Sequence, residues 1–77
     1  MNTIGERIRF LRESKNMTQP QLADATGISK GNVSLLENDK VKPSTEALLA
    51  LSKCFNVSTD WLLTGKDNAN KSNDVEN

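Results

Sequence analysis

The sequence predicts an all-α domain built from five short helices. Three observations favour this fold class. Apolar residues recur at helical spacing along the chain, as in Ile4, Ile8 and Leu11. A serine or threonine precedes each amphipathic stretch, where its side-chain oxygen can accept a hydrogen bond from the first turn of a helix. No stretch shows the alternating apolar and polar residues of a half-buried β-strand.

The first helix is marked by a capping box as well as by the apolar stripe just described. Thr3 is followed three residues later by Glu6, a spacing at which each side chain can bind the other residue's backbone N–H. The stripe would bury one side of the helix against the rest of the domain. We expect this helix to run from about residue 4 to about residue 15.

The second and third helices are short, and a glycine turn joins them. Thr18 and Gln21 form a second capping box, so a helix begins directly after Thr18. Gly27 suits the left-handed conformation that ends a helix, which limits this helix to about eight residues. Ser29 then offers an N-cap for a third helix, which we expect to end near Glu37.

The fourth and fifth helices follow a polar loop at residues 38–43. Ser44 is placed to cap the fourth helix and Ser58 to cap the fifth, which ends at Gly65. Trp61 in the fifth helix is expected either in the core or at a subunit interface. The fourth helix has one broad inward face, formed by Ala47, Leu48, Leu51, Cys54 and Phe55.

Composition restricts the possible functions of this 77-residue chain. One cysteine and no histidine exclude an internal disulfide, a zinc cluster of cysteine and histidine, and a histidine-based catalytic pair. We therefore expect a protein that is not an enzyme and uses no cofactor and no metal. No apolar run approaches the roughly 20 residues of a membrane span, and the charged N-terminus does not resemble an export signal. A cytoplasmic protein with no membrane partner is expected.

Charge and polarity divide the chain near residue 66. The formal net charge is zero, but residues 1–66 carry nine Lys and Arg against seven Asp and Glu, a net charge of +2. Residues 66–77 hold too few apolar side chains to offset the entropy of ordering, so we expect a folded domain over residues 1–65 and a disordered polar tail or linker over 66–77. Positive residues are grouped, and this grouping sets a local electrostatic field. The first helix holds Arg7, Arg9, Arg12 and Lys15, and the region of the third helix holds Lys30, Lys40 and Lys42.

Two segments carry a family resemblance. TQPQLADATGISKGNVSLLEN, residues 18–38, has two capped helices joined by a tight turn, with the small Ala23 where they cross and Val33 and Leu36 pointing into the crossing. PSTEALLALSKCFNVSTDWLLTG, residues 43–65, supplies two closing helices. Together they resemble the lambda-repressor-like helix-turn-helix family of phage repressors and bacterial regulators. The resemblance implies a compact five-helix DNA-binding domain with its helix-turn-helix at the second and third helices.

The resemblance also implies a function. Members of this family bind operator DNA, usually as two-fold dimers, with the third helix in the major groove. We therefore expect a sequence-specific transcriptional regulator, a repressor that binds a palindromic operator as a homodimer. On a helical wheel, the candidate base contacts project away from the inward side of the third helix: Lys30, Gly31, Asn32, Ser34 and Leu35. The candidate phosphate contacts are Gln19, Ser29, Asn38, Lys40 and Lys42.

Several candidate residues also have a purely structural interpretation. Lys30 is either a solvated surface charge or a contact for guanine O6 and N7. Leu35 is either a tolerated exposed apolar residue or a contact for thymine methyl groups, and Gly31 would let the backbone approach DNA closely. Arg12 and Glu37 occupy positions that pair in the resembling repressors and hold the third helix in place; otherwise they are independent surface charges.

A protein-interaction module, such as an antitoxin with secondary DNA binding, is the alternative function. Phe10 and Leu49 lie to one side of the inward faces of their helices, where a partner could cover them. Single exposed apolar residues are common on globular proteins, and they need no such role. The sequence alone leaves both functions open.

Overall fold

The computed structural model describes residues 1–66, and this part of the chain contains five α-helices and no strand. The all-α prediction is therefore confirmed. The predicted polar tail lies outside the described residues, apart from Lys66. The helices are α1 (Ile4–Ser14), α2 (Gln19–Thr26), α3 (Lys30–Glu37), α4 (Thr45–Phe55) and α5 (Thr59–Thr64).

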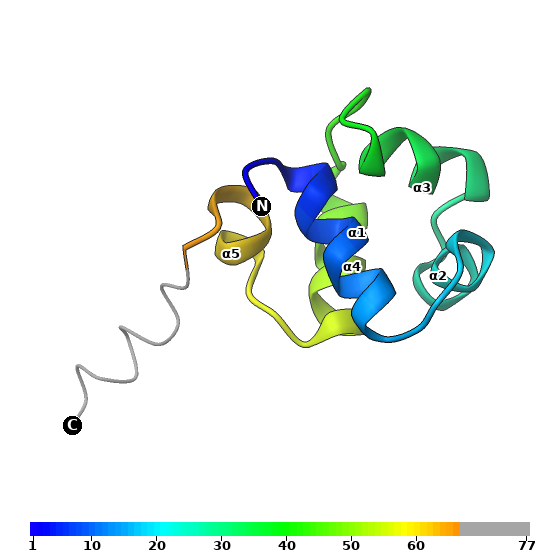
Figure 1. The fold of residues 1–77 in the computed structure, drawn as a ribbon. Helices are drawn as coiled ribbons and strands as arrows, with labels where there is room; N and C mark the ends of the chain where they lie inside the picture. Colours follow the sequence, from blue (N-terminus) through cyan, green and yellow to red (C-terminus); the bar gives the residue numbers. More distant parts are fainter. Residues whose placement is uncertain (67–77) are drawn as a thin grey trace.

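The five helices form a closed ring in which each packs mainly against two others. α1 packs against α3, α3 against α2, α2 against α4, α4 against α5, and α5 against α1. Figure 1 shows the consequence, with α3 and α5 at opposite ends of the domain and α2 beside α3. α3 therefore lies at the edge of the molecule, supported from one side only.

Local sequence signals fix where the helices begin and end. Both capping boxes are complete, with Thr3 and Glu6 at the start of α1 and Thr18 and Gln21 at the start of α2. α2 ends at Gly27, whose φ of 80° lies in the left-handed region that favours glycine. Each predicted N-cap side chain accepts a hydrogen bond from the backbone N–H three residues later: Thr3, Thr18, Ser29, Ser44 and Ser58.

The core lies inside the ring and draws on every helix. Six of its apolar side chains are at most 1% exposed, and burying each contributes about 1.5–3 kcal/mol relative to leaving it in water. Cys54 and Trp61 are half-buried and pack against this cluster. The six residues are Ile8, Leu22, Val33, Leu36, Leu51 and Leu62.

The N-terminus of α1 lies directly against the C-terminal backbone of α3. A Cβ atom built on Gly5 would lie 2.5 Å from the carbonyl oxygens of both Leu36 and Glu37, so only glycine fits at this position. Asp39 strengthens the contact: its carboxylate accepts hydrogen bonds from the Gly5 N–H at 2.9 Å and from the Thr3 hydroxyl at 2.7 Å. This contact fixes α3, and the loop that follows it, relative to α1.

Arg7, one of the grouped positive residues of α1, is buried and does not contribute to a basic surface. It is only 4% exposed, because it follows Ile4 by three residues and precedes Leu11 by four, which places it on the inward stripe. Its guanidinium donates from Nε to Leu62 O at 2.8 Å and from Nη2 to Leu63 O at 2.9 Å. Arg7 therefore satisfies carbonyls near the end of α5, where the helix dipole favours a positive charge.

Candidate nucleic-acid interface

α3 has one packed side and one open side. Val33, Leu36 and Glu37 are buried, because the turn after α2 directs this side of α3 toward α1 and α2. A Cβ atom built on Gly31 would meet no other atom within 4 Å, and Leu35 is 43% exposed. The open side therefore faces solvent, with free space around Gly31.

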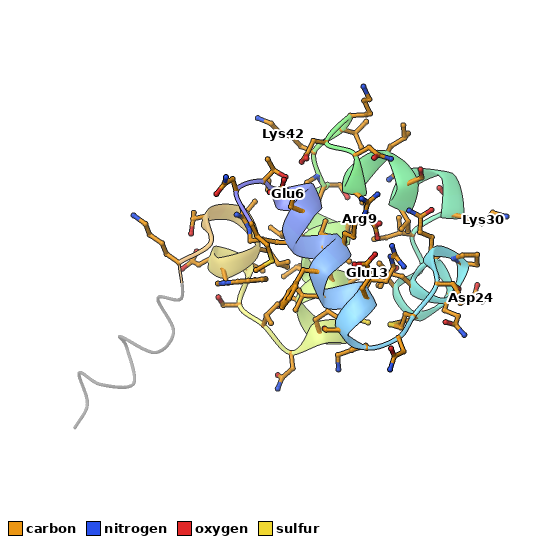
Figure 2. The ribbon with its side chains drawn as sticks, viewed as in Figure 1. Glu6, Arg9, Glu13, Asp24, Lys30 and Lys42 are labelled. Atoms are coloured by element: carbon orange, nitrogen blue, oxygen red, sulfur yellow. The ribbon has the colours of Figure 1, made fainter. Side chains whose placement is uncertain are left out.

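The five predicted base contacts all lie on α3. Lys30, Gly31, Asn32 and Leu35 are exposed, and Ser34 is half-buried. Figure 2 shows the Lys30 side chain extending away from the body of the domain. The structure thus brings these residues together on one short helix, four of them exposed on its open side.

The turn between α2 and α3 is held by a threonine. The Thr26 hydroxyl donates a hydrogen bond to Leu22 O at 2.7 Å and accepts one from the Ile28 N–H at 3.2 Å. Ser29 follows, and its hydroxyl accepts a hydrogen bond from the Asn32 N–H at 3.2 Å. These local bonds fix the direction in which α3 leaves α2. The predicted phosphate contact Ser29 is exposed at the N-terminus of α3, where the helix dipole favours an anion.

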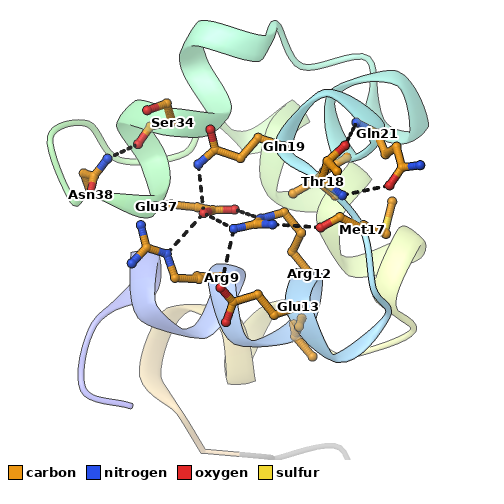
Figure 3. A network of polar contacts seen from close by, with 12 residues as sticks. Arg9, Arg12, Glu13, Met17, Thr18, Gln19, Gln21, Ser34, Glu37 and Asn38 are labelled. Atoms are coloured by element: carbon orange, nitrogen blue, oxygen red, sulfur yellow. Dashed lines mark hydrogen bonds and ion pairs between the residues drawn. The ribbon is translucent and has the colours of Figure 1, made fainter.

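A buried carboxylate joins α1 to α3. Glu37 has a fully buried side chain and binds Arg12 through two hydrogen bonds, Nε to Oε2 at 2.6 Å and Nη2 to Oε1 at 3.0 Å (Figure 3). Arg12 also donates from Nη1 to Met17 O at 2.7 Å, in the connection between α1 and α2. The two residues thus form one pair, which links α1, the connection between α1 and α2, and the end of α3.

The same pair perturbs both ionisation equilibria. Burial of the Glu37 carboxylate acts to raise its pKa, but hydrogen bonds from Arg12 and Gln19 and the positive charge of Arg12 outweigh burial, so the pKa lies below its ordinary value. The hydrogen bond to Glu37 raises the pKa of Arg12. The pair is therefore ionised at neutral pH.

Two predicted phosphate contacts already make hydrogen bonds within the domain. Gln19 donates from Nε2 to Glu37 Oε1 at 3.1 Å, and Asn38 donates from Nδ2 to Ser34 O at 2.9 Å. Each side-chain amide has two N–H donors, so one donor on each residue remains available to a ligand. Figure 3 shows Gln19 and Asn38 on either side of Glu37, beside α3.

The loop after α3 carries the other two predicted phosphate contacts, Lys40 and Lys42. Both are exposed, and the Lys40 N–H donates to Leu35 O at 2.9 Å at the end of α3. Figure 2 shows Lys42 and Lys30 near opposite ends of α3. The structure therefore does not gather the lysines into one cluster but places them at the two ends of the open helix.

Sequence reasoning missed two residues of this region. Asp39 adopts a left-handed backbone conformation, with φ of 59°, and binds the start of α1. Arg9 directs Nε toward Glu37 Oε1 at 3.4 Å, and its side chain is 48% exposed. No local pattern reveals either contact, because each joins residues 28 or more positions apart in the sequence.

Comparison with known proteins identifies the family. A family model described as "Helix-turn-helix domain" matches residues 5–68. The chain belongs to this helix-turn-helix family. The transcriptional regulator ImmR of Bacillus subtilis is 39% identical over 96% of the chain, and the regulator DicA of Escherichia coli is 40% identical over 96%. The chain spans 58% and 55% of the lengths of these two relatives.

A solved structure of the family has the same fold. The crystal structure of the c2 repressor of Salmonella phage P22 in complex with a synthetic operator matches 86% of the chain and 100% of the repressor chain, with 38% identity and a TM-score of 0.82. The predicted five-helix, lambda-repressor-like fold of this helix-turn-helix domain is confirmed by that similarity. Within residues 1–66, no helix is long and apolar enough to cross a bilayer, and no three metal-binding side chains are grouped.

Proposed function

We propose that this helix-turn-helix domain is a sequence-specific, DNA-binding transcriptional regulator that acts as a repressor in the cytoplasm. The observation that carries the proposal is the open side of α3, where Gly31 and Leu35 are exposed while Val33 and Leu36 of the same helix are buried. The major groove of B-DNA is about 12 Å wide and admits an α-helix. The P22 relative, solved in complex with a synthetic operator, supports DNA as the partner of this fold.

Base recognition in this proposal comes from the exposed side of α3. Lys30 would donate to guanine O6 and N7, and Leu35 would contact thymine methyl groups. Gly31 has no side chain, so the α3 backbone can approach the base edges closely. Asn32 and Ser34 offer an amide and a hydroxyl for further hydrogen bonds to bases. A good base contact discriminates by about 1–3 kcal/mol.

Phosphate contacts would position the domain on the duplex. Lys40 and Lys42 would hold the backbone at one end of α3, and Ser29 would do so at the other end, near the N-terminus of the helix. Gln19 and Asn38 would each use the amide N–H that their internal hydrogen bonds leave available. These contacts supply affinity but no sequence preference.

Repression in this proposal is steric. A homodimer would bind two half-sites of a palindromic operator about 34 Å apart, one helical turn of DNA, so that both α3 helices enter the major groove on the same side of the duplex. The bound dimer would block polymerase and carry out no chemistry on the DNA.

Selection of bound duplexes from a random pool tests this function. We expect an inverted repeat to emerge, with half-sites spaced by one helical turn. A shift assay with the selected duplex and a scrambled duplex should then show at least about 10³-fold tighter binding to the selected one. A double variant, Lys30→Ala with Leu35→Ala, is the matched control, because both side chains are exposed and the fold should survive. Equal affinity of the wild type for both duplexes would contradict the proposal.

A protein-interaction module, such as an antitoxin, is the second candidate function. Phe10 is 49% exposed and Leu49 is 48% exposed, as their positions on the helical wheel predicted. Purification from the native host at moderate salt distinguishes the two functions. A stoichiometric protein partner lost in Phe10→Ser or Leu49→Ser would favour this candidate, and a single-component preparation that binds an inverted repeat would exclude it.

A further inference from the structure

We propose that the DNA backbone also runs across α1, where Arg9 binds a phosphate. This inference rests on the proposed function and extends the interface beyond the helix-turn-helix and its following loop. Arg9 lies in α1, with its side chain directed toward the C-terminal end of α3 (Figure 3). The contact would be a charge-assisted hydrogen bond between a guanidinium and a phosphodiester oxygen.

The hydrogen-bonding state of Arg9 leaves most of its guanidinium available. Its side chain is 48% exposed, and its contact with the protein is the long Nε bond to Glu37 Oε1 at 3.4 Å. A guanidinium has five N–H donors, and four of them, on Nη1 and Nη2, have no hydrogen-bond partner within residues 1–66. Paired N–H groups of this kind match the oxygens of a phosphate.

Glu37 holds Arg9 beside a residue already assigned to phosphate binding. Oε1 of Glu37 accepts from Arg9 Nε at 3.4 Å and from Gln19 Nε2 at 3.1 Å, so these two nitrogens lie within about 6.5 Å of each other. Figure 3 shows both side chains directed to Glu37, Gln19 from α2 and Arg9 from α1. A phosphate bound by Gln19 would therefore lie near Arg9, and the backbone of one DNA strand can bind both side chains.

The charges around Glu37 favour an anion at Arg9 and not at Arg12. Arg12 is only 12% exposed and meets the Glu37 carboxylate with two hydrogen bonds, so its charge is neutralised internally. Arg9 keeps an exposed positive charge. Glu13 follows Arg9 by four residues on α1, is 63% exposed and lies 3.8 Å from Arg12 Nη2. A strand that passes Arg9 would also approach Glu13, whose negative charge would weaken binding.

The test is the salt dependence of binding to a short duplex of random sequence, which needs no knowledge of the operator. We expect Arg9→Ala to reduce the slope of log K against log salt by about 0.9, one phosphate contact. The wild type should then lose about threefold more affinity than the variant between 50 and 200 mM salt. Arg9→Lys should keep the slope, and Glu13→Gln should tighten binding.

Lys53→Ala is the matched control for charge. Lys53 is exposed in the last turn of α4, the end of that helix far from α3 in Figure 1, so its removal should leave the slope unchanged. Thermal unfolding of each variant separates binding from folding. A lower melting temperature of Arg9→Ala with an unchanged slope would show a structural role and overturn the inference. Absence of salt-dependent binding by the wild type would instead overturn the proposed function.

Discussion

Arg12 and Glu37 form a two-bond ion pair across the interface between α1 and α3, with the carboxylate fully buried. The pair lies on the opposite side of α3 from Gly31 and Leu35. The Arg12–Glu37 pair therefore fixes the orientation of α3 from its packed side. DNA bound to the proposed contacting side does not need to touch this pair.

Arg12→Ala should reduce the free energy of unfolding by roughly 3 kcal/mol, because it leaves the buried Glu37 carboxylate without its main partner. A domain of this size has on the order of 5 kcal/mol in total, so the variant should be close to unfolding at 25 °C. Urea denaturation followed by circular dichroism measures the change. Arg9→Ala is the control: its pair with Glu37 is half exposed, and its loss should cost under about 1 kcal/mol. Equal losses in the two variants would contradict this account.

Acid should destabilise the domain partly through Glu37. Because folding lowers the pKa of this carboxylate, its contribution to stability is present above the unfolded-state pKa of about 4.3 and is lost as the pH falls through the lower, folded-state value. Urea denaturation at several pH values should show wild type more stable than Glu37→Gln at pH 7, with the difference narrowing below about pH 4.3. A stability difference between wild type and Glu37→Gln that stays constant down to pH 3 would show that Glu37 does not cause the acid sensitivity.

Because of Asp39, the stability of the Glu37→Gln variant should still depend on pH in the acid range. Hydrogen bonds from the Thr3 hydroxyl and then from the Gly5 N–H hold the pKa of Asp39 below its ordinary value, so it acts in the same direction as Glu37. The double variant Glu37→Gln with Asp39→Asn should therefore be less acid-sensitive than either single variant. Asparagine suits this position because it tolerates the left-handed backbone.

Two glycine-to-alanine substitutions should have opposite effects on stability. Gly5→Ala introduces a Cβ against the Leu36 and Glu37 carbonyl oxygens, so α1 must move away from α3, and we expect a loss of about 1–3 kcal/mol or more. Gly31→Ala adds a methyl group in open space on a helix, and we expect a gain of up to about 1 kcal/mol. Melting temperatures of the two variants give the comparison, and a stabilised Gly5→Ala would show that the interface is more tolerant than its geometry indicates.

Leu35→Ala and Lys30→Ala should change target preference without changing stability. Both side chains are exposed and neither belongs to the core. Each should reduce discrimination by about 1–3 kcal/mol at the base pair that it contacts, with little effect on binding to random DNA. Affinities for a set of single-substituted operators locate that base pair. Uniform weakening across the set would reassign the residue to phosphate binding.

Lys40→Ala and Lys42→Ala should instead weaken binding to every duplex by the same factor. Both residues lie in the loop after α3, which we propose lies against the phosphates and outside the groove. Each substitution should lower the salt slope by about 0.9, measured by titration at four or more salt concentrations. Selective loss at one base pair would place that lysine in the groove.

The helix boundaries were predictable because their signals are local. A capping side chain, the residue three positions later and the glycine that ends the helix all lie within one short segment, as at Thr18, Gln21 and Gly27. α1 ends at Ser14, one residue before the expected end, because Lys15 serves as its C-cap. The open and packed sides of α3 followed from periodicity in the same way.

The contacts between helices were not predictable from local signals. The interaction of Gly5 with α3 and the bonds from Asp39 to α1 join residues over 30 positions apart, and nothing in either segment indicates its partner. Arg7 could have been found, since its spacing from Ile4 and Leu11 places it on the inward stripe. Its bonds to the Leu62 and Leu63 carbonyl oxygens were not predictable, because those carbonyls are more than 50 residues away in the sequence.

The absence of neighbours around Gly31 has a consequence for how such domains diverge. If the proposed function holds, inherited changes on that side of the helix alter which operators are bound, while the protein keeps its ability to fold. Gly5 has the opposite character, because any larger residue there disturbs the whole scaffold. Under the proposed function, relatives of this chain can therefore diverge in their DNA targets through a few substitutions on α3, while the contact between Gly5 and the end of α3 has to be retained.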